Sequence, residues 1–219
     1  MTATLPVTAA PAARPASRGV LTRLAARSAY LLSGFPIAAV AFVLLVTGVA
    51  AAAGTLVITV GVGIAAVTLG VARAFARVER VRLDAVTGTR LPRPAYRPTR
   101  PGVLGHVLST GADPRRWLDL LHGIVAFPIA TATFAVTVAW WAAALGGVTY
   151  GLWSWALPRP DSPDNTTLAE LLGYDGRTAD IVLTSGIGVA ALLTLPLVVA
   201  ACAAVQTGLG RALLGAWED

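Results

Sequence analysis

Four long runs of apolar residues without a single charged side chain constrain this 219-residue chain more than any other feature. They cover residues 30–53, 55–72, 124–157 and 181–205. An α-helix needs about 20 apolar residues to cross the roughly 30 Å hydrocarbon core of a bilayer. The sequence therefore predicts an all-α membrane protein with four transmembrane helices, over about residues 30–53, 55–72, 124–150 and 181–205.

The overall composition agrees with a membrane protein. Hydrophobic residues make up 56% of the chain and charged residues only 13%, whereas soluble domains carry about 25% charged residues. An ordinary soluble enzyme and a disordered tail are therefore excluded. The single cysteine, Cys202, also excludes an intramolecular disulfide.

The distribution of arginine predicts the orientation in the membrane. All 17 basic residues are arginine, and the formal net charge is +6. Ten arginines fall in residues 73–122, whereas residues 158–180 hold two arginines and five acidic residues. Because basic loops stay in the cytoplasm, we expect loop 73–122 and both termini inside the plasma membrane and loop 151–180 outside. This location accounts for the excess of basic residues, so no nucleic-acid partner is expected.

The N-terminal region divides into two parts. Residues 1–17 are rich in Pro, Ala and Thr and are predicted to be a disordered cytoplasmic arm. Residues 18–217 then form one four-span domain, entered through a basic amphipathic stretch. The alternative is a cleaved secretory signal, but its apolar core would be only about 7–15 residues long, shorter than the first run.

A short motif recurs at the start of the first and third apolar runs. Phe-Pro-Ile-Ala occupies residues 35–38 and 127–130, and a further phenylalanine, Phe42 or Phe134, follows four residues later. We therefore predict two parallel-repeat helical hairpins with the same orientation, related by an axis along the membrane normal. Pro196, within the fourth run, is expected to kink its helix.

Two groups of side chains on the predicted cytoplasmic side are candidate contact sites. Arg73, Arg77 and Arg80 recur at i, i+4 and i+7 on one face of an amphipathic helix. Asp113 and Pro114 predict the start of a second helix, which carries Arg115, Arg116 and Trp117. These residues could contact a protein partner, but binding of anionic lipid headgroups is the favoured interpretation.

Five aromatic residues cluster on the predicted outer side: Trp140, Trp141, Tyr150, Trp153 and Trp155. They could form an aromatic surface for an apolar or cationic ligand. An aromatic belt at headgroup depth is the favoured interpretation, because Trp and Tyr concentrate at membrane interfaces.

The sequence offers no catalytic, cofactor-binding or metal site. His106 and His122 are far apart, no nucleotide-binding motif is present, and the apolar runs contain no ionisable residue that an ion-coupled transporter would need. We therefore expect a protein that is not an enzyme. Five glycines are expected to permit close helix contacts: Gly61, Gly63, Gly70, Gly186 and Gly188.

Several motifs resemble the "putative sensor" domain family of high-GC Gram-positive bacteria. They are residues 30–36 (YLLSGFP), residues 113–121 (DPRRWLDLL), Phe127-Pro128 and residues 210–215 (GRALLG). In that family a four-span input domain typically precedes the dimerisation and ATPase domains of a histidine kinase. Neither of those domains is present in these 219 residues, so phosphotransfer is not carried over to this chain. Either the module stands alone and acts through a partner, or the sequence is a piece of a longer kinase.

These observations together predict a non-enzymatic sensory or regulatory membrane domain. The expected partners are membrane lipids, a cytoplasmic histidine kinase or another signalling protein, and a second copy of the chain in a homodimer. Two alternatives remain: a small oligomeric transporter or channel for an uncharged solute, and a lipid enzyme. The polar residues available to a lipid enzyme are Asp113, Asp119 and His122.

Overall fold

The computed structural model describes residues 19–56, 60–89, 96, 98, 101–157, 168–174 and 176–215. The predicted N-terminal arm lies outside the described residues, and so do four arginines of the central loop: Arg90, Arg93, Arg97 and Arg100. Within the described part the chain is helical, without strands. Its elements are α1 (Val20–Gly54), α2 (Val60–Thr87), α3 (Val103–Gly111), α4 (Pro114–Val148), α5 (Tyr150–Trp153), η2 (Ser154–Ala156), α6 (Leu168–Leu171) and α7 (Arg177–Leu214).

Four of these helices, α1, α2, α4 and α7, are long and apolar enough to cross a membrane. This confirms the predicted class of an all-α protein with four candidate spans. Each helix is longer than its apolar run, with lengths of 35, 28, 35 and 38 residues. At 1.5 Å per residue, even α2 is about 42 Å long, so its basic end continues the same helix beyond the predicted span.

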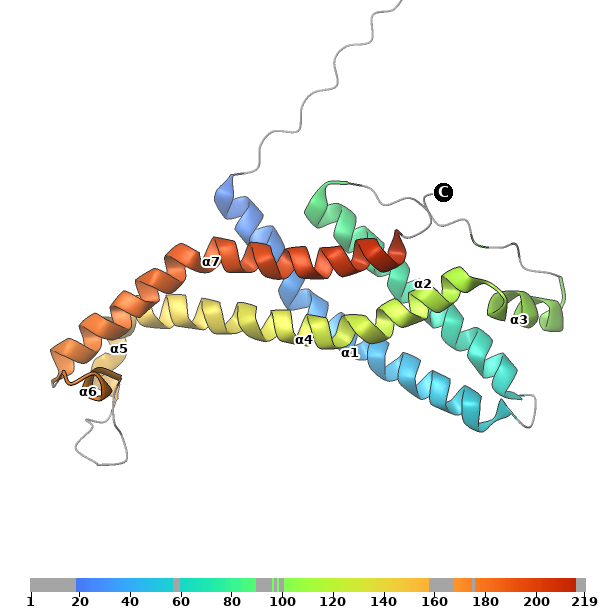
Figure 1. Ribbon diagram of the computed structural model, residues 1–219, viewed down its shortest axis with the longest axis horizontal. Coiled ribbons are helices and arrows are strands. Elements are labelled where there is room, and N and C mark those ends of the chain that lie inside the picture. Colours follow the sequence, from blue (N-terminus) through green and yellow to red (C-terminus); the bar gives the residue numbers. More distant parts are fainter. Residues whose placement is uncertain are drawn as a thin grey trace, which may run out of the picture.

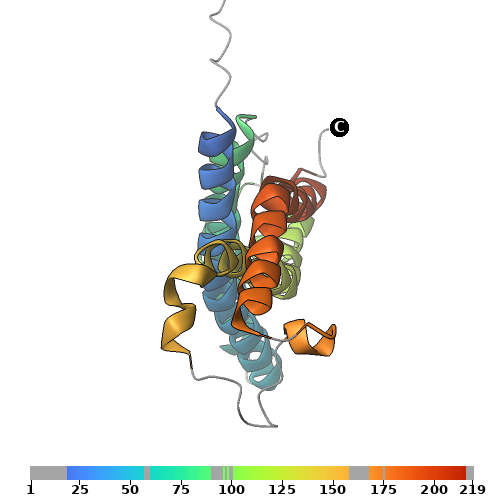
Figure 2. The ribbon, with the colours of Figure 1, turned by 90° about the vertical axis from the view of Figure 1, so that its left-hand side faces the viewer.

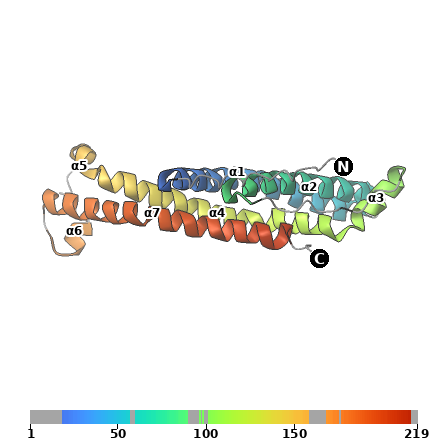
Figure 3. The same cartoon turned by 90° about the horizontal axis from the view of Figure 1, so that it is seen from above.

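The four long helices form two antiparallel hairpins. α1 and α2 meet at a tight connection, where the amide of Gly61 donates to the carbonyl of Thr55 at 3.1 Å. α4 and α7 touch backbone to backbone, with Gly147 against Gly188. Figure 3 shows the hairpins as two layers, with α3 at one end and α5 and α6 at the other. Figure 2 shows α5 and α6 on opposite sides of α7.

The relative orientation of the two hairpins differs from the predicted parallel repeat. Trp141 Nε1 donates to Ser28 Oγ at 3.1 Å, and the Phe42 and Phe127 rings are 4.6 Å apart. A Cβ on Gly123 would meet Leu45. Later residues of α1 thus contact earlier residues of α4, so these two helices cross in opposite directions (Figure 1).

The phenylalanines of the repeated motifs meet at this crossing. Phe35 stacks on Phe134 at 4.8 Å, and Phe42 stacks on Phe127 at 4.6 Å, so each motif contacts the other reciprocally. Helical periodicity places both phenylalanines of a repeat on one face, but it does not determine the direction in which two such faces meet. The axis that relates these contacts therefore passes through the phenylalanine cluster and gives α1 and α4 opposite directions, whereas the predicted repeat gave them the same direction.

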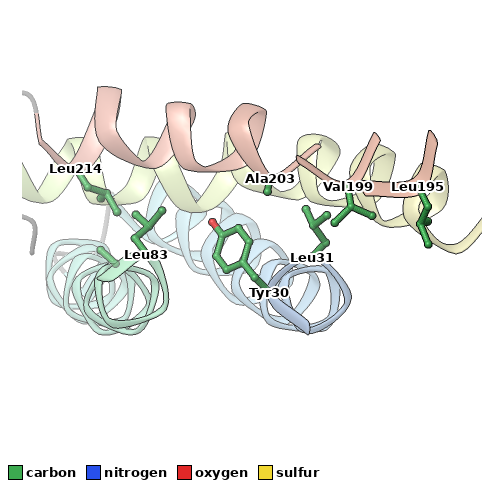
Figure 4. Close-up of a cluster of buried hydrophobic side chains, with 8 residues drawn as sticks. Tyr30, Leu31, Leu83, Leu195, Val199, Ala203 and Leu214 are labelled. Atoms are coloured by element: carbon green, nitrogen blue, oxygen red, sulfur yellow. The ribbon is translucent and has the colours of Figure 1, made fainter. Parts of the chain in front are cut away.

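Aliphatic packing joins α7 to both helices of the first hairpin. Tyr30 and Leu31 of α1 and Leu83 of α2 belong to the same buried cluster as Leu195, Val199, Ala203 and Leu214 of α7 (Figure 4). Leu83 lies directly against Gly210, where a Cβ would approach its Cδ1 to 2.6 Å. This cluster packs the second half of α7 against the first part of α1 and the last part of α2.

Among the described residues, the predicted close contacts are present at two of the five glycines and absent at three. Gly61 and Gly188 make the expected close contacts with backbone atoms, whereas Gly63, Gly70 and Gly186 have open space where a side chain would be. For those three the prediction was wrong. Pro196 lies inside α7, which bends along its length in Figure 1.

Candidate functional site

The start of α4 folds back on α3 through the motif at residues 113–117. Asp113 caps the helix by accepting from the amide of Arg115 at 3.1 Å, and Pro114 occupies the first turn, as predicted. The buried Arg116 donates to Thr110 Oγ1 at 3.0 Å. Trp117 Nε1 donates to the carbonyl of Gly111 at 2.9 Å. The motif therefore fixes the angle between α3 and α4.

Asp119, one turn further along α4, joins the two hairpins. It is only 2% exposed, and its Oδ1 accepts from Arg80 Nη2 of α2 at 3.0 Å. Its second oxygen, Oδ2, accepts from the Tyr96 hydroxyl at 2.8 Å. One buried carboxylate thus connects α2, α4 and the segment between them.

Tyr96 lies among three arginines. The guanidinium of Arg73 stacks over its ring at 4.0 Å from the centroid, and that of Arg116 lies 6.0 Å away. Arg80 Nη1 donates to its hydroxyl at 3.3 Å. Burial raises the pKa of Tyr96, and its hydrogen bond to Asp119 raises it further. The phenol therefore keeps its proton and donates to Asp119 throughout the neutral pH range.

We call Arg73, Arg80, Tyr96, Arg116 and Asp119 the arginine junction. Sequence reasoning identified its three arginines as candidates and missed the central tyrosine. Tyr96 stands alone in a basic, proline-rich segment. A single aromatic residue among arginines was the available signal, because guanidinium groups stack on aromatic rings.

A second polar group joins α1 to α2 beside the junction. The Tyr30 hydroxyl donates to Glu79 Oε1 at 2.6 Å, and Arg82 pairs with the other oxygen of Glu79. Arg82 Nη2 also donates to the carbonyl of Tyr30 at 2.6 Å. Charge on α2 is therefore neutralised largely inside the molecule at Glu79, Arg80 and Arg82.

The predicted arginine face on α2 is divided by these contacts. Arg73 and Arg80, two turns apart, both reach Tyr96, whereas Arg77 is exposed. At the start of α4, Arg116 is buried, Arg115 is half-buried and Trp117 is 50% exposed. Contact with headgroups or a partner stays a prediction, for which Arg77 and Trp117 have the required exposure.

The five outer aromatic residues do not gather into one surface. Trp141 bonds to Ser28 of α1, while Trp140 donates to Thr194 Oγ1 of α7 at 3.0 Å. Tyr150 and Trp153 make an edge-to-face pair with centroids 5.1 Å apart. Trp155 bonds only locally, to the carbonyl of Leu152 at 2.9 Å, and is 74% exposed. An aromatic belt at headgroup depth stays a prediction.

In the part of the chain that the structure describes, no three His, Cys, Asp or Glu side chains lie close enough together to bind a metal ion. The described geometry instead offers buried ion pairs and stacked aromatic rings that connect separate helices.

The fold and the arginine junction define the class as an all-α, multi-pass membrane protein whose two helical hairpins are joined by buried charges. The sequence model of the family described as "Putative sensor" matches residues 30–214, and the chain belongs to this family. The family description supports a sensor-type role. Comparison with curated proteins and with solved structures gave no match.

Proposed function

We propose that this chain is a non-enzymatic sensory domain of the plasma membrane that relays a membrane or extracytoplasmic stimulus to a cytoplasmic partner such as a histidine kinase. The arginine distribution assigns its termini and central loop to the cytoplasm. That assignment gives α1 and α4 the same direction across the bilayer, whereas the Ser28–Trp141 bond brings the predicted inner end of α1 to the predicted outer part of α4. Reporter fusions and cross-linking decide between the two. The observation that carries the proposal is the bond of Asp119 to both Arg80 and Tyr96, because it ties the central loop to the packing of the two hairpins.

The mechanism is a change in how the hairpins cross. Stacked phenylalanines and small side chains at the crossing favour a pivot, since two packed surfaces have a few discrete arrangements. Pro196 and the Gly147–Gly188 contact allow α7 to follow such a change. Rotation of one hairpin would pull Asp119 away from Arg80 and Tyr96, and the central loop would then be released toward the partner.

The arginine junction suits a two-state relay. Separating Asp119 from Arg80 and Tyr96 leaves buried polar groups without partners, at about 1–3 kcal/mol for each group, so a loosened junction is disfavoured without a stimulus. A ligand that prefers the other crossing must supply that difference in binding free energy. The output is thereby held low until the stimulus arrives.

A matched pair of variants tests this proposal. The full chain is co-expressed with a candidate histidine kinase, and kinase autophosphorylation is measured in isolated membranes. Because the intact junction holds the output low, Arg80→Gln should raise the phosphorylation level by at least about tenfold, which corresponds to about 1.4 kcal/mol in the relay equilibrium. Arg77→Gln, an exposed arginine one turn away, should leave the level nearly unchanged.

Membrane insertion of both variants is measured by carbonate extraction as a control. Equal phosphorylation in the wild type, Arg80→Gln and Arg77→Gln, with equal insertion, would remove the junction from the mechanism. Reporter fusions at Pro98 test the assigned orientation separately, and activity of a periplasmic-type reporter there would contradict it.

A further inference from the structure

A small cavity lies where the two hairpins cross. Its volume is about 40 Å³, and both copies of the repeated motif form its walls. Ile37 and Ala38 contribute from α1, and the equivalent Ile129 and Ala130 contribute from α4. The cavity thus occupies the point about which the hairpins would move, in a position that neither hairpin could form alone.

One side of this crossing cavity is polar. His122 and Gln206 line it, although they are only 6% and 8% exposed. His122 Nδ1 has no hydrogen-bond partner among the described residues. Gln206 uses its Nε2 to donate to Thr133 Oγ1 at 2.5 Å, and its Oε1 lies 3.2 Å from the position of a Cβ on Gly34.

The unpartnered nitrogen of His122 requires a partner that the described chain does not supply. A buried polar atom without a hydrogen bond costs about 1–3 kcal/mol. About 10–15 Å³ of such volume holds one water, so the crossing cavity has room for the small polar end of a ligand. Its remaining walls, which include Phe75 and Leu209, are apolar.

The charges around the cavity select a neutral ligand. Glu79 and Arg82 both line it, but they pair with each other. A charged ligand would have to leave water without an uncompensated opposite charge to receive it, which is costly. A hydroxyl group has one O–H donor and two lone pairs, so it can accept from a protonated His122 Nδ1 while it donates to Gln206 Oε1, or donate to an unprotonated Nδ1 instead.

We propose that the crossing cavity binds the hydroxyl end of a neutral membrane amphiphile, with His122 and Gln206 as its hydrogen-bonding partners. The assignment of this ligand as the stimulus rests on the proposed sensory function; binding itself does not. The ligand would contact α4 through His122, α7 through Gln206 and α1 beside Gly34. Its binding would therefore stabilise one crossing of the hairpins over another.

Photolabelling of the full chain in lipid nanodiscs tests this site. The probe is hexadecanol with a diazirine next to the hydroxyl end, and labelled peptides are mapped by mass spectrometry. Label is expected on peptides that contain Ile37–Ala38 or Ile129–Ala130. The same probe with its hydroxyl replaced by a methyl group should label them about tenfold less, for loss of about 1.4 kcal/mol of hydrogen bonding.

Two glycine variants provide a matched comparison. Gly34→Ala places a methyl group 3.2 Å from Arg82 Nη2 and Gln206 Oε1, both at the ends of flexible side chains, so the fold can accept it while the polar side is filled. Labelling should fall about tenfold. Gly63→Ala makes the same change in α2 where nothing lies within 4 Å, and labelling should stay at the wild-type level.

Substitutions at His122 test the hydrogen bond itself. His122→Phe removes the polar nitrogen and should reduce labelling, whereas His122→Asn keeps a polar atom near it and should retain most of the label. Circular dichroism verifies that each variant is folded. Competition with unlabelled hexadecanol or with dioleoylglycerol distinguishes a single-chain alcohol from a diacylglycerol as the source of the hydroxyl.

Equal labelling of the wild type, Gly34→Ala and His122→Phe, or label confined to the lipid-facing side of the helices, would overturn the proposal and leave a cavity filled by water. This readout is independent of kinase phosphorylation. Lost labelling with an intact effect of Arg80→Gln on phosphorylation would overturn the ligand site alone. Intact labelling without that effect would overturn the relay alone.

Discussion

The two ends of the molecule are held together by different kinds of interaction. At the arginine junction Arg116 and Asp119 are buried and Arg73 and Arg80 are half-buried. Its bonds cross between elements, as from Asp119 to Arg80 and Tyr96. At the opposite end, α5 and α6 pack on α7, and the aromatic side chains are more exposed. Trp153 and Trp155 are 41% and 74% exposed there.

The two kinds of interaction differ in how strictly they fix the positions of the helices. A buried ion pair in a low-dielectric interior has strict geometry, and losing one member leaves the other uncompensated. Aromatic rings at a membrane interface tolerate many positions, because each needs only an apolar body and a wet edge. Substitutions should therefore have large effects at the junction and small effects at the aromatic end.

The largest expected difference in unfolding free energy is between an aspartate at the junction and an aspartate at the aromatic end. Asp119→Ala leaves Arg80 and the Tyr96 hydroxyl without their buried partner, and it should lower the free energy of unfolding by about 3 kcal/mol. Asp180→Ala removes the half-buried acceptor of the Tyr150 hydroxyl and the acidic residue in the first turn of α7, and it should cost about 1 kcal/mol. Unfolding by sodium dodecyl sulfate in mixed micelles measures both, and equal losses would erase the contrast.

A pair of glycines in α7 should give the next largest effect. A Cβ on Gly188 would lie 2.4 Å from backbone atoms of Gly147 and Val148, so Gly188→Ala must push α7 away from α4. Overpacking of this kind costs about 1–3 kcal/mol. Gly186→Ala, with nothing within 4 Å, serves as the control and should be neutral or slightly stabilising. Comparable destabilisation by both would show that the close contact is absent.

A smaller effect is expected from removing one hydroxyl at each end. Tyr96→Phe keeps the ring beneath Arg73 but loses the bonds to Asp119 and Arg80, which should cost about 1 kcal/mol. Tyr150→Phe loses a bond to a half-buried aspartate and should cost less. The same unfolding assay ranks the two, and a larger loss for Tyr150→Phe would reverse the comparison.

The smallest effect is the pH dependence of Tyr96. Because its pKa is raised in the folded chain, its contribution to stability is present below the ordinary tyrosine pKa of about 10. That contribution is lost as pH rises through the folded value. Ultraviolet titration near 295 nm should therefore lose a late-titrating component in Tyr96→Phe. Loss of an early component instead would contradict the buried hydrogen bond.

Much of the fold follows from periodicity and charge. Uncharged apolar runs of sufficient length identified the four long helices, and Asp113-Pro114 identified the start of α4. These features are local, because an apolar run or an N-cap acts through neighbouring residues. The arginines at positions 73, 80 and 116 were recognised as candidates from helical spacing and from the helix start after Asp113, which are also local features.

The remaining features depend on contacts between distant segments. The repeated Phe-Pro-Ile-Ala motif indicated two similar faces, but either direction of crossing can stack Phe35 and Phe42 on Phe127 and Phe134. Tyr96 lies outside any periodic pattern, and its role requires Arg73 from α2 and Asp119 from α4 at once. The crossing cavity similarly needs walls from both hairpins, which no single segment predicts.

Chemical cross-linking between α1 and α4 tests the crossed arrangement most directly. In a Cys202→Ala background, Ser28→Cys is combined with either Trp141→Cys or Leu121→Cys, and membranes are treated with a short bismaleimide. Because Trp141 bonds to Ser28, the account predicts cross-linking of the 28–141 pair and little of the 28–121 pair. Efficient cross-linking of residues 28 and 121, without that of 28 and 141, would show that the hairpins run parallel and contradict the account.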